Sequence, residues 1–318
     1  MRTNMLAAAA AGWMLAASAQ AATWTVTPYA GVPGAIYSQA MGMNDLGTLV
    51  VQSDSGSYID DHGVFTSYAG FGPHDFGGLT DISNSGVLVG NRNGVGFIDD
   101  HGTLTHLNVA GSTYTNAFSI SANGRYVSGT YGTSADWHSQ EGFVYDRATS
   151  TYSTVLAPVD QYVDALGGVN DAGVAVGDFS DDDYMSTSFL YDAVAGTHQE
   201  IGEFGGLHGP LVISINDAGE LAGLSFEPNP EFRIVGFVGT PGGSVATIAP
   251  PAPDDFLQVR DLTNSGLALG QVIGPDGSPS NVLLTEVSAV PEPSSSLLLV
   301  CALAALCAGA RRRASDAR

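Results

Sequence analysis

The sequence has 318 residues, enough for one large domain or two small ones. It contains 41 Gly and no Lys, and its 32 acids against ten Arg give a formal charge of −22. With 44% hydrophobic residues, the chain can bury a sizeable core and is not disordered. The acidity excludes a nucleic-acid partner, because too few cations are present to replace the counterions of a phosphate backbone.

Residues 1–21 have the features of a secretory signal peptide. Arg2 gives a positive start, Met5 to Ala17 is an apolar helix-forming stretch, and Ala19-Gln20-Ala21 is a small-x-small cleavage site. We expect export through the inner membrane and cleavage by signal peptidase after Ala21, with cleavage after Ala19 as the alternative. A buried helix of a cytosolic protein is the other interpretation.

Residues 289–318 have three parts in a fixed order. Pro291-Glu292-Pro293 leads through three serines into the apolar stretch Leu297–Ala310, and Arg311-Arg312-Arg313 follows at once. Fourteen apolar residues fall short of the roughly 17 needed to span a bilayer. The three arginines would hold their end in the cytoplasm.

This tail resembles the PEP-CTERM sorting domain of Gram-negative bacteria. The resemblance covers about the last thirty residues. It implies that the C-terminal hydrophobic helix anchors the protein briefly in the membrane and that an exosortase processes it near Pro-Glu-Pro. It also implies a cell-surface or extracellular location and an association with exopolysaccharide and biofilm production. A permanent single-pass anchor is the alternative.

The region between the two ends has no cysteine, since Cys301 and Cys307 both lie in the tail. An exported domain without disulfides must be stabilised by packed area. Residues 22–288 hold 30 acids and five arginines. We expect this region to be a monomer.

One motif occurs six times in this region: an apolar residue, two or three residues of the Asn, Asp or Ser type, and Gly, followed by an apolar run. The copies are Met43–Gly47, Ile82–Gly86, Ile120–Gly124, Val169–Gly173, Ile215–Gly219 and Leu262–Gly266. A second glycine follows as Gly90, Gly129, Gly177, Gly223 and Gly270, with Val51 in the first copy. The spacings between the first glycines are 39, 38, 49, 46 and 47, a mean of about 44.

These repeats predict an all-β, six-bladed β-propeller of four-stranded blades. Asn, Asp and Gly favour tight hairpin turns, and no stretch has sustained helical periodicity. Four short strands every 44 or so residues match the length of a propeller blade. The predicted repeats are 40–78, 79–116, 117–165, 166–211, 212–258 and 259–288. The motif also resembles the HAF-type extracellular repeat often found in PEP-CTERM proteins. A sandwich of irregular hairpins is the alternative fold.

The sixth repeat has only three strands before the tail begins. The segment Trp24–Gly31 reads like Val64–Gly70, the fourth strand of the first repeat. We expect residues 23–28 to pair with Val282–Glu286, which would remove both exposed sheet edges.

Catalytic motifs are weak in this chain, and we predict that it is not an enzyme. None of the seven His has metal-ligand spacing, and His62 and His101 occupy the same Asp-Asp-His-Gly turn in two repeats, which indicates a structural turn. No Gly-x-Ser-x-Gly elbow is present. Paired carboxylates acting on extracellular glycans, as in propeller glycosidases, remain the alternative.

The acid run at 178–183 is the one candidate metal site, and no cofactor motif is present. Its acids are Asp178, Asp181, Asp182 and Asp183. They could supply oxygens to Ca²⁺ but lack the order of an EF-hand loop, so a solvated acidic loop is the favoured interpretation.

Long loops that differ between repeats are the candidate binding surface, because variable loops on a rigid scaffold usually carry function. Their aromatic and amide residues suit a saccharide. The candidate ligand-binding residues are Asn91, Arg92, Asn93, Tyr131, Trp137, His138 and Tyr184. We therefore predict a non-catalytic surface or matrix protein that binds extracellular polysaccharide or another matrix polymer. A purely structural matrix protein is a further alternative.

Overall fold

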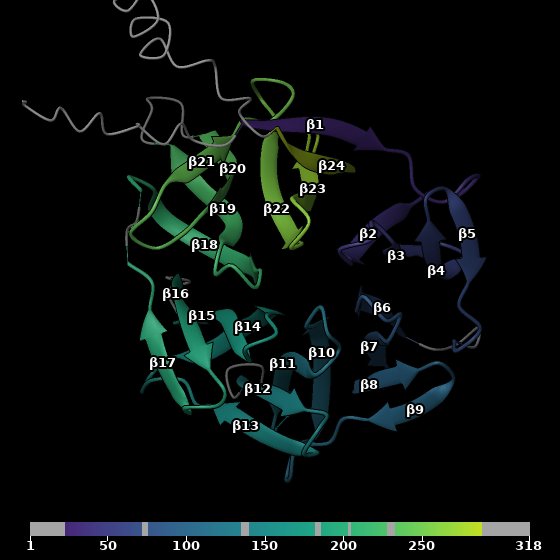
Figure 1. The fold of residues 1–318 in the computed structure, drawn as a ribbon, viewed down its shortest axis with the longest axis vertical. Helices are drawn as coiled ribbons and strands as arrows, with labels where there is room; N and C mark the ends of the chain where they lie inside the picture. Colours follow the sequence, from purple (N-terminus) through teal and green to yellow (C-terminus); the bar gives the residue numbers. More distant parts are fainter. Residues whose placement is uncertain are drawn as a thin grey trace, which may run out of the picture.

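The computed structural model describes residues 23–71, 76–134, 140–181, 186–202, 205–227 and 233–287. These residues form six four-stranded antiparallel sheets around one axis, so the predicted six-bladed β-propeller is confirmed (Figure 1). The predicted signal helix and sorting tail lie outside the described residues. Within the described part of the chain, no helix is long and apolar enough to cross a membrane.

Each blade is a meander whose first strand lies nearest the axis (Figure 1). Blade 1 contains β2 (Ser38–Met43), β3 (Leu49–Ser53), β4 (Gly56–Asp61) and β5 (Val64–Ser67). Blade 2 contains β6 (Gly77–Ile82), β7 (Leu88–Arg92), β8 (Val95–Asp100) and β9 (Thr103–His106). Blade 3 contains β10 (Tyr114–Ile120), β11 (Tyr126–Gly132), β12 (Gln140–Asp146) and β13 (Thr151–Val155).

The remaining blades follow in chain order. Blade 4 contains β14 (Tyr162–Val169), β15 (Val174–Ser180), β16 (Ser186–Asp192) and β17 (Thr197–Glu200). Blade 5 contains β18 (His208–Ile215), β19 (Leu221–Glu227), β20 (Arg233–Gly239) and β21 (Val245–Ile248). Blade 6 contains β22 (Phe256–Leu262), β23 (Leu267–Ile273) and β24 (Pro279–Val287), and its fourth strand is β1 (Thr23–Tyr29).

The repeated motif forms the turn between the first and second strands of each blade. The first glycine has positive φ in all six turns, for example 81° at Gly47, a conformation that Gly adopts without steric cost. Because the motif ends the inner strand, the predicted repeats begin two to four residues inside β2, β6, β10, β14, β18 and β22.

The second glycine of the motif leaves room for a ring. Gly129 on β11 pairs with Phe143 on β12, and a Cβ at Gly129 would lie 2.8 Å from Phe143 Cζ and 1.9 Å from the Asn116 carbonyl oxygen. Gly90 and Gly177 face Phe97 and Phe189 in the same way. The pairing of glycine with phenylalanine in the sequence is therefore a packing requirement.

The hydrophobic core lies between neighbouring blades. One cluster joins Val89 and Ile98 of blade 2 to Ala117, Val127 and Phe143 of blade 3. Blades 3 and 4 share a comparable cluster. Each blade thus depends on the next for burial, as expected for repeats that cannot bury their faces alone.

The predicted closure of the ring is confirmed. Residues Thr23–Tyr29 pair antiparallel with β24, with Trp24 opposite Glu286 and Pro28 opposite Val282. The likeness of this strand to β5 and the residue that follows it, Tyr68, extends to side chains. Tyr29 donates to Asp60 of the next blade at 2.7 Å, and Tyr68 donates to Asp99 at 2.8 Å.

The Asp-Asp-His-Gly segments are hairpin turns between third and fourth strands. His62 and His101 have positive φ, as do the glycines that follow them, which is the geometry of a type I′ turn. Asp60 and Asp99 accept from the turn glycines at 2.6 Å. The structural interpretation of these two histidines is confirmed.

Candidate functional site

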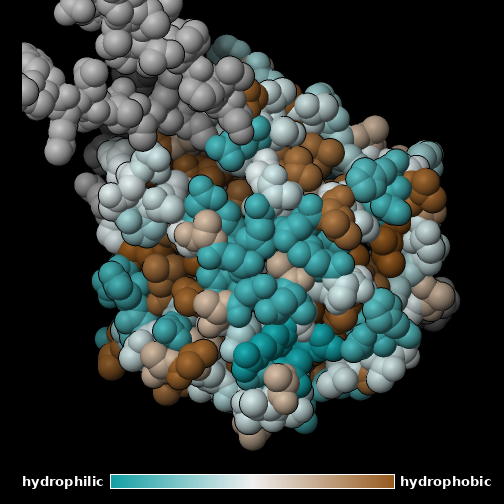
Figure 2. Space-filling model, viewed as in Figure 1, coloured by the Kyte–Doolittle hydropathy of each residue, from teal (hydrophilic) through white to brown (hydrophobic). Residues whose placement is uncertain are grey.

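The propeller has two different ends. The turn face carries the six repeat turns and the turns between third and fourth strands. The loop face, at the opposite end, carries the loops between second and third strands and the connections between blades. In the view down the axis, hydrophilic residues gather over the centre of the visible face (Figure 2).

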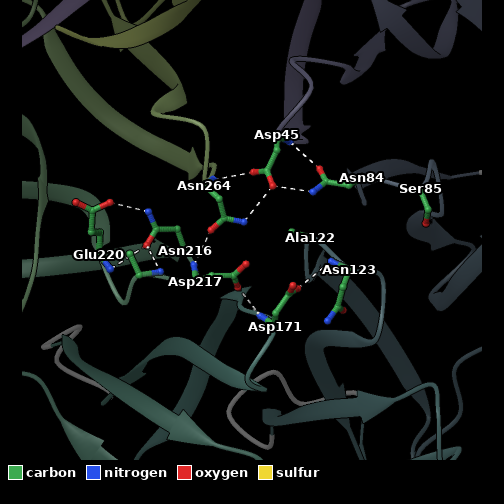
Figure 3. A pocket seen from close by; sticks show the side chains of 11 residues that line it. Asp45, Asn84, Ser85, Ala122, Asn123, Asp171, Asn216, Asp217, Glu220 and Asn264 are labelled. Atoms are coloured by element: carbon green, nitrogen blue, oxygen red, sulfur yellow. Dashed lines mark hydrogen bonds between the residues drawn. The ribbon is translucent and has the colours of Figure 1, made fainter. Parts of the chain in front are cut away.

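At the turn face the six repeat turns are joined by hydrogen bonds into a closed ring, the turn ring (Figure 3). Backbone N–H groups of one blade donate to side chains of the next. These bonds are Asp45 to Asn84 at 2.9 Å, Asn123 to Asp171 at 2.8 Å, Asp171 to Asp217 at 2.7 Å, Asp217 to Asn264 at 2.8 Å and Asn264 to Asp45 at 2.7 Å. Blade 3 has Ala122 at this position, and Asn84 N–H donates to its carbonyl oxygen at 2.9 Å.

The first polar residue of the motif stabilises its own turn. Asn44 Oδ1 accepts from the N–H groups of Leu46 and Thr48, at 3.1 and 3.0 Å. Asn170 and Asn216 do the same in blades 4 and 5. One motif position therefore closes the turn, and the next one joins the blades.

The turn ring surrounds a hollow of about 800 Å³ (Figure 3). Carboxylates of Asp45, Asp171, Asp217 and Glu220 belong to its lining, and none of the described residues that line it is Lys, Arg or His. Burial raises the pKa of Asp171, and the nearby carboxylates of Asp217 and Asp45 add to this rise. Asp45, Asp171 and Asp217 each accept a backbone N–H from an adjacent blade, so these carboxylates hold the blades together.

Two further carboxylates lie buried deeper in the channel. Asp81 accepts from the N–H groups of Ile82 and Ile120 and from Ser119 Oγ, at 2.8, 2.9 and 2.7 Å. Asp261 accepts from Met43 N–H at 2.7 Å and also from Leu262 N–H and Ser214 Oγ.

Burial raises the pKa of both carboxyls, that of Asp261 to about 6. Asp261 also raises the pKa of Asp81 by charge repulsion. Both groups bond to neighbouring blades, so their arrangement again joins blades.

A β-bulge interrupts every inner strand just before the repeat motif. The bulges turn one residue of each blade toward the axis, and a cavity of about 250 Å³ lies among them. These six residues are Met41, Thr80, Phe118, Gly167, Ile213 and Arg260. Apolar side chains and one guanidinium line this cavity, together with the carboxylates of Asp81 and Asp261.

The loop face exposes four aromatic rings. Inner strands begin at this face, and second strands end there. Tyr37 and Phe76 immediately precede inner strands, Phe256 begins one, and Phe226 lies at the end of β19. Their exposed fractions are 45%, 83%, 40% and 42%. Rings of this kind are the groups that stack on flat apolar ligand faces.

The four candidate ligand-binding residues in the described structure have different environments. Asn91 accepts from Ala117 N–H at 2.7 Å and donates to the Ala117 carbonyl at 3.0 Å, so its side chain joins blades 2 and 3. Tyr131 is buried in the core. Asn93 has positive φ in the turn after β7, and Phe76 N–H donates to its Oδ1. Arg92 ends β7 at the loop face and is half-buried.

The other three candidates, Trp137, His138 and Tyr184, lie outside the described residues. Their role in binding stays a prediction.

The acid run is divided by the strand that carries its first member. Asp178 lies in β15 and is buried, whereas Asp181 follows the end of this strand. Asp182 and Asp183 lie outside the described residues. Burial, together with the charge and hydrogen bonding of Asp164, raises the pKa of Asp178 to about 7. Across the described ranges, no group of three or more His, Cys, Asp or Glu is arranged to hold a metal ion.

Sequence reasoning missed the channel-lining residues and the exposed rings of Tyr37, Phe76 and Phe226. A signal for the former is present, because each bulge residue stands three positions before the first turn residue of its motif, as Arg260 does before Thr263. Aligning the six repeats on the motif would have found the whole lining. The aromatics have no comparable signal, since their exposure depends on the packing around them.

Comparisons with known proteins support the fold alone. No protein-family model matches the chain, and neither does any curated protein. A subtype N11 neuraminidase-like protein of an influenza virus from a flat-faced bat is 11% identical with a TM-score of 0.51, covering 86% of this chain and 95% of that one. TolB from Acinetobacter baumannii is 13% identical with a TM-score of 0.42, covering 75% of this chain. This chain spans 59% of the length of that TolB.

An oligogalacturonate lyase from Vibrio parahaemolyticus is 10% identical with a TM-score of 0.45, covering 85% of this chain and 98% of that one.

Proposed function

We propose that this protein is an exported, non-catalytic component of the cell surface or extracellular matrix that binds saccharide or another matrix polymer at its loop face. Its C-terminal tail would direct sorting by an exosortase after a brief stay in the membrane. The observation that carries the proposal is the set of exposed rings of Tyr37, Phe76, Phe226 and Phe256 at this face. Exposed rings beside polar groups suit sugars, which present both apolar ring faces and hydroxyls.

The opposite face supports the same proposal by its chemistry. The carboxylates of the turn ring accept backbone N–H groups of adjacent blades. A residue that joins blades has a structural reason to be present at every repeat. We therefore place binding on the loop face, where the exposed aromatic rings do not join blades.

The test compares the mature chain with a loop-face double variant, Phe76→Ala with Phe256→Ala. Retention on immobilised exopolysaccharide should fall at least tenfold, and the thermal midpoint should change little because both rings are exposed. The control is Leu46→Ala with Val64→Ala, which removes exposed apolar side chains from the turn face. Equal retention by both double variants would contradict the proposal, as would a large loss of stability from the first.

A glycosidase acting through paired carboxylates is the second candidate. The observation in its favour is the proximity of Asp171 and Asp217 in the turn-face hollow, where each raises the local negative charge. Release of reducing ends from a polysaccharide panel by the wild type, and its loss in Asp217→Asn, would favour this enzyme over the binding module.

A further inference from the structure

Among the described residues that line the channel cavity, Arg260 is the one cation. It is the bulge residue of blade 6, and its neighbours around the cavity include Met41, Phe118 and Ile213. The cavity of about 250 Å³ has space for roughly eight waters at ~30 Å³ each. That is about the space one sugar ring occupies.

The guanidinium of Arg260 is poorly satisfied by the protein. Its hydrogen bond runs from Nη1 to Gln271 Oε1 at 3.4 Å, and Gln258 donates to the same oxygen at 2.7 Å. Within the described chain, no carboxylate lies within 4 Å of Arg260. The neighbouring Asp261 carboxylate is directed to Met43, Ser214 and Leu262 instead. A guanidinium offers five donors, so most of them are left for another partner.

Two other arginines of the propeller, Arg125 and Arg147, are paired with carboxylates. Arg125 contacts Asp146 at 2.9 Å, and Arg147 contacts Asp100 at 2.8 Å. Arg260 is partly exposed, and desolvation lowers the pKa of its guanidinium. Removing a charge from water costs stability unless it is paired and hydrogen-bonded, so a ligand that pairs with this guanidinium would offset the cost.

We propose that the channel cavity is a subsite for a single carboxylate-bearing sugar, a uronate, whose carboxylate is held by Arg260. This inference rests on the proposed function, since it names the sugar class that the loop face would bind. The planar fork of a guanidinium matches a carboxylate in a bidentate geometry. Phe118 and Met41 offer apolar surface to the sugar ring, and Tyr37 lies close enough to Arg260 to influence its charge.

The charged and titratable groups that face Arg260 set the pH dependence of binding. They are Asp81 and Asp261 in the cavity and Tyr37 beside it. Burial raises the pKa of both carboxyls, so lowering the pH from 7.5 to 5.5 reduces negative charge next to the ligand while Arg260 stays charged. Uronate binding should strengthen over this interval.

The experiment measures binding of glucuronate, glucose, acetate and sulfate to the mature chain by calorimetry at pH 5.5 and 7.5. We expect glucuronate to bind at least tenfold more tightly than glucose. In Arg260→Met this preference should disappear, and in Arg260→Lys it should fall because the fork is lost while the charge remains. Equal affinity of the wild type for glucuronate and glucose would overturn the inference. Acetate or sulfate binding as tightly as glucuronate would do the same, because the site would then select an anion and not a sugar.

A stability measurement separates a binding role from a structural one. If Arg260 is kept for a ligand, Arg260→Met should raise the thermal midpoint without ligand, because a partly desolvated charge without an ion pair is removed. A lower midpoint in this variant would show a structural role and overturn the inference.

Failure of this inference and failure of the proposed function give different results. Retention of neutral polysaccharide by the loop-face rings, with no preference for uronate, would leave the proposed function standing and remove the subsite. Tight glucuronate binding without any effect of Phe76→Ala and Phe256→Ala on polymer retention would leave the subsite and remove the loop-face proposal.

Discussion

Replacing Asp178 by Asn should make the propeller more stable at pH 8 and leave its stability near pH 4 almost unchanged. Asp178 is 6% exposed and lies beside Asp164, and its pKa is raised from 3.8 to about 7. Because the folded state holds this proton more tightly than the unfolded chain, the contribution to stability is full below pH 4. It is lost as the pH rises through 7.

The size of the effect follows from the acid constants. Each tenfold difference in the acid constant between the folded and unfolded states corresponds to about 1.4 kcal/mol. The ionised Asp178 side chain therefore lowers the free energy of unfolding by about 4 kcal/mol at pH 8. For a domain of this size 1 kcal/mol shifts the midpoint by roughly 2–4 °C, so Asp178→Asn should raise it by roughly 8–16 °C at pH 8.

The assay is thermal unfolding of both proteins from pH 4 to pH 8, with and without Ca²⁺. The control is Asp254→Asn, which changes an exposed acid and should have little effect at any pH. A difference between Asp178→Asn and wild type that does not vary with pH would refute the reasoning. Stabilisation of the wild type by Ca²⁺, absent in Asp178→Asn, would favour the metal-binding interpretation of the acid run instead.

Three further predictions test the architecture and the sorting tail. Gly129→Ala should lower the free energy of unfolding, measured by chemical denaturation, by about 3 kcal/mol, because the new Cβ would lie 1.9 Å from the Asn116 carbonyl oxygen. The control is Gly202→Ala, which has open space around its Cβ and should leave this free energy unchanged. Asp45→Ala should lower the free energy of unfolding by about 1–3 kcal/mol, because it removes the hydrogen bonds from Asn84 and Asn264 to one carboxylate. Its control is the neighbouring variant Leu46→Ala, and equal effects of the two would contradict the role of the turn ring. Deleting residues 297–318 or replacing Glu292 should change where the protein is found in fractionated cells, and mature protein from the native host that still carries residues 297–318 would disprove processing.

The number and kind of blades could be predicted because each repeat turn is built from local chemistry. Asn44 bonds within its own turn, and Gly47 supplies the positive φ of the same turn. Interactions between residues two to four positions apart produce a local sequence pattern that can be recognised. The closing strand was also predictable. The sixth repeat supplies only three of the four strands of its blade, so its open edge needs a strand from elsewhere in the chain.

The sites depended on contacts that no local pattern specifies. Asp45 bonds to Asn264 across 219 residues, and only ring closure brings them together. Arg260 faces the axis because a bulge turns it there, and its lack of an ion pair follows from the different partners that Asp261 finds in blades 1 and 5. From the sequence, Asn91 could have bound a ligand, but in the structure its side chain is hydrogen-bonded to the Ala117 backbone of the neighbouring blade. The repeat determines the blade, whereas the packing of six blades decides which polar side chains are used up between them and which remain for a ligand.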